Sequence, residues 1–268
     1  MTGLIDIFKE SLQYPIKDIK LLLIFGVFFV VMQLSNILFG WGVNLGSAVN
    51  AILGILALVA AILVFGYFVA VLRENISGSD AVPEIDFGTN FIDGIKYLIV
   101  AIVYMIIPFI ISVIIAAVTG VFGNAIEIGS IISQNPELIE YATALTQGIP
   151  QDLLAGLFGG LAITAVISVI LFIIFVLLFL IASARLAETG SIKEALLINK
   201  VIEDIGEIGF GRYIGWYIIY IIIALVLGII FAIISAIPYI GALLSALVCS
   251  PFIYLFEGRA LGLLYGEK

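Results

Sequence analysis

Six long apolar runs dominate the chain and set its fold class. A helix needs about 20 apolar residues to cross the hydrocarbon of a bilayer, and in lipid it satisfies its own backbone hydrogen bonds. We therefore predict an all-α fold, a polytopic transmembrane helical bundle, with residues 1–268 forming a single integral membrane domain. The predicted spans cover approximately residues 20–39, 46–71, 97–120, 155–184, 213–236 and 239–257.

The composition agrees with a membrane protein and excludes several kinds of site. Hydrophobic residues make up 63% of the chain and charged residues 11%, against about 45–50% and about 25% in soluble domains. With no His and only Cys249, the chain lacks the residues for a Ser-His-Asp triad, a His-ligated zinc or an internal disulfide. We identify no catalytic, cofactor-binding or metal residues and expect no cofactor. The net charge of −8 argues against nucleic acid as a partner.

The basic residues predict the orientation of the chain. Six alternating crossings place all eleven Lys and Arg residues on the side of the N-terminus. Short cytoplasmic loops of membrane proteins carry the excess of Lys and Arg. We expect a multi-pass protein of the cell membrane with both termini in the cytoplasm. The basic residues are Lys9, Lys17, Lys20, Arg73, Lys96, Arg185, Lys193, Lys200, Arg212, Arg259 and Lys268.

The turns arrange the spans as three hairpins. Short segments around Trp41 and around Pro238 join spans one to two and five to six. The exception is an acidic extracytoplasmic loop at 121–152. Within it, Asn135-Pro136-Glu137 resembles a helix start and Gln147-Gly148 a helix stop, so we expect a short helix there.

Amphipathic interfacial helices are expected on the cytoplasmic side. In residues 3–14, polar residues share one helical face, and Leu4, Ile5, Phe8 and Leu12 line the other. A second such helix should begin at the capping box Ser191-x-x-Glu194 and run to about Ile205. Helices of this kind lie flat among lipid headgroups.

The inner ends of the even-numbered spans resemble one another. Each runs six residues into an arginine and has a glutamate close by. The pattern suggests three copies of a unit, although the orientation rule alone also favours an Arg at these positions. We hypothesise that these residues either form a ring of charge-assisted hydrogen bonds or hold anionic lipid headgroups. The positions are Arg73 with Glu74, Arg185 with Glu188, and Arg259 with Glu257.

Close packing of the spans is expected along stripes of small residues spaced four apart. Span five carries Ala224, Gly228, Ala232 and Ala236, and span six carries Gly241, Ser245 and Cys249. Such stripes suit either packing within one subunit or a homo-oligomer face.

Three functions remain open from the residues. Almost no ionisable side chain lies inside the spans, Glu257 being borderline, which counts against ion-coupled transport. The first hypothesis is a non-enzymatic scaffold or accessory subunit that organises membrane lipids or partner proteins. The second is a small permease for a neutral or amphiphilic solute. The third is a membrane-surface enzyme that uses carboxylates, although the acids Asp80, Glu84, Asp86, Glu203 and Asp204 show no catalytic spacing.

Four stretches together resemble a known family. They are Gly78–Gly88 (GSDAVPEIDFG), Phe91–Lys96 (FIDGIK), Arg185–Ser191 (RLAETGS) and Arg259–Tyr265 (RALGLLY). With these stretches, nearly the whole chain resembles the domain-of-unknown-function family 4013, multi-span membrane proteins seen mainly in archaea. The resemblance implies a membrane protein of that type and assigns no activity or functional residue.

Overall fold

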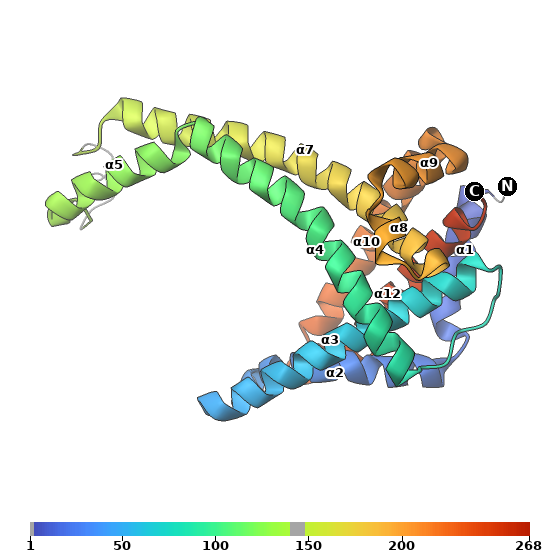
Figure 1. The fold of residues 1–268 in the computed structure, drawn as a ribbon. Coiled ribbons are helices and arrows are strands. Elements are labelled where there is room, and N and C mark those ends of the chain that lie inside the picture. Colours follow the sequence, from blue (N-terminus) through green and yellow to red (C-terminus); the bar gives the residue numbers. More distant parts are fainter. Residues whose placement is uncertain (1–2, 140–147) are drawn as a thin grey trace. The chain divides into compact units, whose positions relative to one another are not determined.

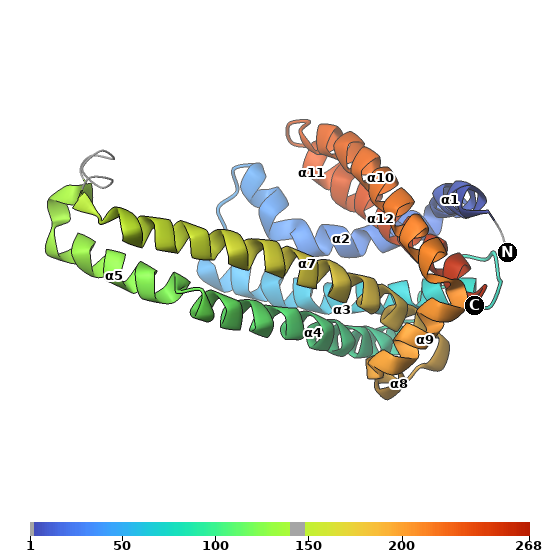
Figure 2. The same cartoon turned by 90° about the horizontal axis from the view of Figure 1, so that it is seen from above.

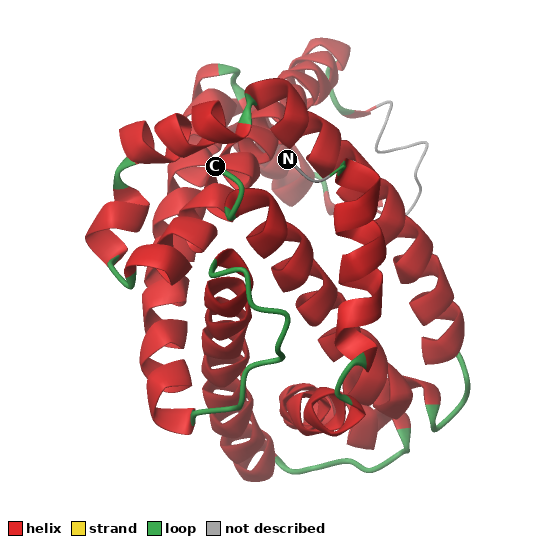
Figure 3. Ribbon diagram, turned by 90° about the vertical axis from the view of Figure 1, so that its right-hand side faces the viewer, coloured by secondary structure: helices red, strands yellow, loops and turns green. Residues whose placement is uncertain are grey.

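The computed structural model describes residues 3–139 and 148–268, and helices are its regular elements. No strand occurs in these ranges (Figure 3). Six of the described helical segments are long and apolar enough to cross a membrane, which confirms the predicted fold class and the number of spans. They are Ile19–Gly40, Ser47–Ile76, Phe87–Val118, Gln151–Thr189, Phe210–Ser235 and Gly241–Tyr265.

The chain forms two compact units. Unit 1 comprises residues 1–101 and 178–268, and unit 2 comprises residues 102–177. Helices α4 (Phe87–Val118) and α7 (Gln151–Thr189) contribute residues to both units. All eleven Lys and Arg residues belong to unit 1. The single membrane domain at 1–268 stays a prediction.

Unit 1 is built around two hairpins of apolar helices. Helix α2 (Ile19–Gly40) packs along α3 (Ser47–Ile76), and α10 (Phe210–Ser235) turns into span six. Figure 2 shows these helices from above. Span six consists of α11 (Gly241–Leu244), a π-helical turn η3 (Ser245–Cys249) and α12 (Ser250–Tyr265), which packs on α3. The core between them contains Phe25, Phe29, Tyr67, Val71 and Leu255.

Glycines allow the closest approaches between helices in unit 1. A Cβ on Gly66 of α3 would lie 1.6 Å from the carbonyl oxygen of Asn90, on α4. A Cβ on Gly26 of α2 would lie 1.9 Å from the carbonyl oxygen of Leu247. Any side chain at these two positions would therefore push the helix backbones apart.

The small residues that pack are partly different from the predicted ones. Gly228 and Ala232 of span five are exposed rather than packed. On α12, Gly258 and Gly262 face α3, where their Cβ atoms would lie 2.8 Å from Val71 Cγ1 and 2.6 Å from Asn75 Cβ. A stripe of small residues marks a helix that can pack closely but does not fix which neighbour it meets.

The segment predicted as a loop at 121–152 begins with a helix. Helix α5 (Val121–Gln134) follows Gly120, whose φ of 77° is left-handed, and buries Val121 and Ile128. Asn135 caps the end of α5, and the short 3-10 helix η2 (Pro136–Ile139) begins directly after it, where the sequence predicted a helix start. Most of the helix predicted up to Gln147 lies outside the described residues. Within unit 2, the hydroxyls of Thr119 and Thr164 are 3.1 Å apart and link α7 to the turn before α5.

The predicted amphipathic segments are helical, with one correction. Helix α1 (Leu4–Gln13) buries Ile7, Phe8 and Ser11 and leaves Ile5, on the predicted apolar face, 66% exposed. The Ser191 side chain caps the next segment as predicted by accepting a hydrogen bond from the Glu194 amide at 3.4 Å. That segment is not one helix, because Leu197 separates α8 (Ile192–Leu196) from α9 (Ile198–Ile208).

Candidate functional site

The charged side chains of unit 1 gather at one end, which we call the charged face. It comprises α1, α8, α9 and the ends of α3, α7 and α12 that carry Arg73, Arg185 and Arg259. Helix α1 packs against α12 here, so the first and last helices of the chain meet at this face (Figure 1). The three arginines belong to the predicted site.

Arg73 joins the end of α3 to the beginning of α4 and the end of α7. Its Nη2 lies 2.8 Å from Asp93 Oδ2, and its Nε donates to the carbonyl oxygen of Ala187 at 3.1 Å. Lys96 also reaches Asp93, at 3.0 Å. The Ala187 carbonyl is one of the last four of α7, which have no partner within the helix. Arg73 thus neutralises a buried carboxylate and caps a helix end.

Arg185 binds the two short helices that follow it. Its Nη1 lies 2.9 Å from Asp204 Oδ2 on α9, and its Nη2 lies 3.1 Å from Glu194 Oε2 on α8. Its Nε donates to the Glu194 carbonyl at 3.2 Å. Asp204 also accepts hydrogen bonds from Tyr265 and Lys268, so the C-terminal residues join the same cluster.

Arg259 is the most buried of the three arginines, with a side chain 4% exposed. Its guanidinium donates to Glu10 on α1 and to Asn75 on α3. It also donates to Asp80 Oδ1 at 2.8 Å and to the Ser79 carbonyl at 2.7 Å. The Tyr14 ring lies 5.2 Å from its central carbon, within range of a cation–π interaction.

The three arginines follow a common pairing scheme. Arg73 and Arg185 each pair with an aspartate that lies 20 and 19 residues further along the chain, in the segment leading into the next span. Arg259 ends the last span and pairs with Glu10, in the segment leading into the first span. The end of each even-numbered span is therefore bound to the segment that enters an odd-numbered one.

The predicted glutamates take other positions. Glu188 accepts hydrogen bonds from Tyr265 at 2.8 Å and from Lys268 at 2.7 Å. Glu257 accepts one from Tyr220 at 2.9 Å. Glu74 is partly buried near the end of α3. The structure thus brings the arginines together with acids other than their sequence neighbours, and the lipid role of the six positions stays a prediction.

Sequence reasoning missed most of the acids that bind the arginines. Asp93 and Asp204 have side chains only 5% exposed, and the other acids bound by the three arginines are Glu194, Glu10 and Asp80. The usable signal was the regular separation of about 20 residues between an Arg and an Asp in two places. Glu10 carries no comparable signal, because it lies 249 residues from Arg259.

Two groups around Arg259 have shifted pKa values. A hydrogen bond from Lys17 lowers the pKa of the exposed Asp80 carboxyl. Burial raises the pKa of the Tyr14 phenol to about 12, and its hydroxyl donates to the Ala81 carbonyl at 2.9 Å. The charged form of Asp80 and the neutral form of Tyr14 are thus the forms that fit the folded charged face.

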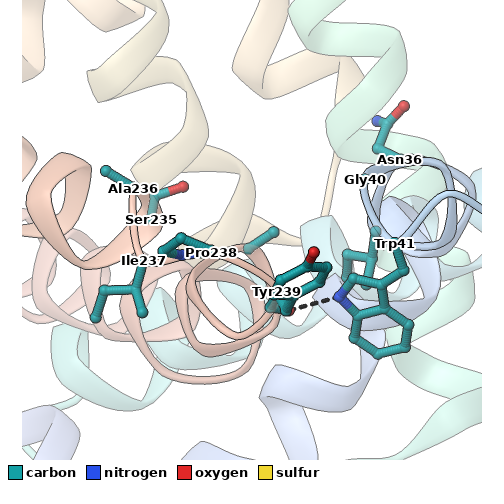
Figure 4. Close-up of a pocket in the computed structure, with 10 residues that line it drawn as sticks. Asn36, Gly40, Trp41, Ser235, Ala236, Ile237, Pro238 and Tyr239 are labelled. Atoms are coloured by element: carbon teal, nitrogen blue, oxygen red, sulfur yellow. Dashed lines mark hydrogen bonds between the residues drawn. The ribbon is translucent and has the colours of Figure 1, made fainter.

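The opposite end of unit 1 is uncharged and has a small pocket. The pocket has a volume of about 190 Å³ and lies between the turn after α2 and the turn after α10 (Figure 4). Trp41 Nε1 donates to the Tyr239 carbonyl at 2.5 Å and links the two turns. This volume is below the about 300–1,000 Å³ usual for ligand sites. In the described part of the chain no group of three or more His, Cys, Asp or Glu residues could hold a metal ion.

The fold and the paired charges define a multi-pass helical membrane protein. The model of the family described as protein of unknown function (DUF4013) matches residues 49–236. The chain therefore belongs to that family, as its sequence motifs indicated. No curated protein and no solved structure matches the chain.

Proposed function

We propose that the protein is a non-enzymatic scaffold of the cell membrane that organises lipids through amphipathic helices held at its charged face. In this proposal the charged face and both termini lie in the cytoplasm. One observation carries it. The spans bind the amphipathic helices α1 and α9 by ion pairs, through Arg259 to Glu10 and Arg185 to Asp204, while both helices keep large apolar residues exposed.

The exposed apolar residues are those that a headgroup region would cover. Ile5 on α1 is 66% exposed, and Ile202 on α9 is 56% exposed. Another face of α9 is buried through Val201, Asp204, Ile205 and Ile208. A helix fixed on one face by protein and apolar on another can order the lipid beside it.

The arginines themselves support scaffolding rather than substrate handling. Their guanidinium groups bind carboxylates and backbone carbonyls of the same chain. Replacing the contact of Arg73 to Asp93 or of Arg185 to Asp204 with a ligand would remove one of the two cations bound to a buried carboxylate, which is costly. The face is thus suited to holding a fixed shape.

The lipid role is tested by purifying the protein from native membranes and measuring bound lipid by mass spectrometry. We expect the wild type to retain lipid and the double variant Ile5→Ser with Ile202→Ser to retain clearly less, with the helical content unchanged. Ile99→Ser, at an exposed position on α4, is the matched control and should retain lipid. Equal lipid retention in all three proteins, or solute flux into proteoliposomes, would contradict the proposal.

The orientation is tested with single cysteines. Replacing Cys249 with Ala gives a cysteine-free background, because the chain has no other Cys. A cysteine at Ser191 should then react with an impermeant maleimide only after the cells are opened. A cysteine at Ser130, on α5, should react in intact cells. Labelling of both sites from the same side of the membrane would exclude the proposed orientation.

A further inference from the structure

The basic residues of the charged face are largely neutralised by acids of the same chain. Nine of the eleven Lys and Arg residues, all of which lie in the described ranges, have a side-chain nitrogen within 4.0 Å of a carboxylate oxygen. Lys20 and Lys193 form no ion pair with a described residue. The excess of Lys and Arg therefore does not leave the basic surface that a polybasic segment offers to anionic headgroups.

Acids outnumber bases in unit 1. The unit contains fifteen Asp and Glu residues against eleven Lys and Arg residues, which gives a net charge of −4. Two of its exposed glutamates, Glu84 and Glu207, form no ion pair with any described residue. Beside a bilayer, such a surface repels anionic headgroups and attracts the cationic part of a zwitterionic headgroup.

The two unpaired glutamates occur in the same short sequence pattern. Residues 84–88 read Glu-Ile-Asp-Phe-Gly and lead into α4, and residues 207–211 read Glu-Ile-Gly-Phe-Gly and lead into α10. In both, the glutamate lies three residues before the phenylalanine that begins the helix. Phe87 is 61% exposed and Phe210 is 70% exposed. The pattern thus places an unpaired carboxylate and an exposed aromatic ring at the entry of two spans.

Both copies of the pattern are fixed to the protein by the residues around them. In the second copy Ile208 is buried, and in the first copy Ile85 packs against the core of unit 1. The Tyr67 hydroxyl donates to the Pro83 carbonyl at 2.8 Å, directly before the first copy. Helix α9, which contains the start of the second copy, is held through the ion pairs of Asp204. The exposed side chains therefore project from backbone that is already ordered.

An exposed aromatic ring with a carboxylate close by in the chain suits a zwitterionic phospholipid. An apolar ring of this kind lies at the boundary between headgroups and acyl chains. The carboxylate lies in the headgroup layer, where the ammonium group of such a lipid supplies a counter-charge. We propose, as an extension that rests on the scaffold function, that Glu84 with Phe87 and Glu207 with Phe210 contact zwitterionic phospholipids and select them over anionic ones.

The test reconstitutes the purified protein in vesicles that contain equal amounts of phosphatidylcholine and phosphatidylglycerol with the same acyl chains. Lipids that stay bound after mild detergent extraction in about 0.1 M salt are measured by mass spectrometry. We expect the wild type to retain phosphatidylcholine over phosphatidylglycerol about threefold, because one charge near the bilayer surface changes lipid affinity up to about fivefold. Extraction in about 1 M salt shortens the Debye length from about 10 Å to about 3 Å and should bring the ratio close to equality.

The double variant Glu84→Gln with Glu207→Gln removes both charges and keeps the side-chain shapes. It should retain the two lipids about equally, with the total amount of bound lipid unchanged. The matched control Glu84→Asp with Glu207→Asp keeps the charges and should keep the wild-type ratio. A wild type that retains phosphatidylglycerol equally or preferentially, or a Gln variant with the wild-type ratio, would overturn the preference. A basic protein that binds the wild type and is lost from the Gln variant would also overturn it, because the acids would then serve a protein partner.

The two readouts separate this lipid preference from the scaffold function. The preference is measured by the ratio of the two lipids, and the scaffold function by the total lipid lost in Ile5→Ser with Ile202→Ser. Wild-type levels of total lipid in that Ile variant would overturn the scaffold function whatever the ratio is. A ratio close to equality in the wild type, with less total lipid in the Ile variant, would overturn the preference alone.

Discussion

The two ends of unit 1 hold their helices together in different ways. At the charged face, three arginines bind carboxylates and backbone carbonyls from several segments. At the uncharged end, the Trp41 indole donates one hydrogen bond to the Tyr239 carbonyl. An arginine offers five donors in a fixed plane, and an indole offers one. One end can therefore join several segments at each residue, while the other joins two turns.

The difference shows how the charges of a membrane protein can serve its tertiary structure. The basic residues that favour one side of a bilayer also occupy the helix ends, where carbonyls lack partners. At the charged face these carbonyls and nearby acids are bound by the same guanidinium groups. We infer that the basic residues that set the orientation of the chain in the membrane also bind its helix ends together.

The largest expected effect comes from Arg259→Gln. The arginine is 4% exposed and binds segments from α1, from α3 and from the loop after α3. Its loss should reduce the free energy of unfolding by about 3 kcal/mol, measured by denaturant titration in mixed micelles. Arg73→Gln is the matched control and should cost less, because the Arg73 side chain is 41% exposed. Equal losses in the two variants would show that burial does not set the strength of these anchors.

The second effect concerns the packing between the two ends. In Gly66→Ala, the new Cβ would meet the Asn90 carbonyl oxygen at 1.6 Å, so we expect a loss of about 2 kcal/mol in unfolding free energy. Gly54→Ala, on the same helix with open space around it, should be neutral or slightly stabilising. If both substitutions behave alike, close contact between α3 and α4 is not needed.

The third effect concerns the hydrogen bond that links the two turns at the uncharged end. Trp41→Phe keeps an aromatic ring but removes the hydrogen bond to Tyr239, which should cost about 1 kcal/mol. Hydrogen exchange should become faster at the amides of Ile237 and Gly241 in the turn after α10, while the amides of α9 stay unchanged. A loss as large as that of Arg259→Gln would remove the contrast between the two ends.

The smallest effect is a pH dependence at the charged face. The hydrogen bond from Lys17 lowers the pKa of Asp80 in the folded protein. The stability from this pair is therefore present above the unfolded pKa of Asp and is lost as the pH falls through the lower folded value. Because Asp80 is 64% exposed, water screens the pair and the change should stay below about 1 kcal/mol. The variant Asp80→Asn should lack this acid-dependent step, and an unchanged pH profile in the variant would assign the step to another group.

Much of the fold followed from the sequence because lipid selects apolar segments by composition. The predicted 20–39 span lies within α2 at Ile19–Gly40, and the Ser191 cap is present as expected. Helix α4, in contrast, begins at Phe87, before the predicted span at 97–120. Its first turns contain the polar residues Asn90 and Asp93, which hydropathy places outside the span. Both residues are buried in the folded protein. Buried polar residues are tolerated where partners are supplied, and Arg73 is such a partner for Asp93.

The candidate site was predicted only in part. The sequence indicated Arg73, Arg185 and Arg259 because of their shared position at span ends. It did not indicate that Glu10 would reach Arg259 across 249 residues, or that Tyr220 would bind Glu257. These contacts depend on which helices become neighbours, and no local pattern records that.

By itself, the sequence determined which segments dissolve in hydrocarbon and on which side of them the basic residues lie. Transfer of a side chain between water and lipid depends on that side chain and its nearest neighbours along the chain. Only the tertiary structure decided which acid each arginine binds, where Gly66 and Gly26 bring helices into contact, and that Tyr220 binds Glu257. Such pairings depend on distances of a few ångströms between residues that are remote in the sequence, and only the packed helices set those distances.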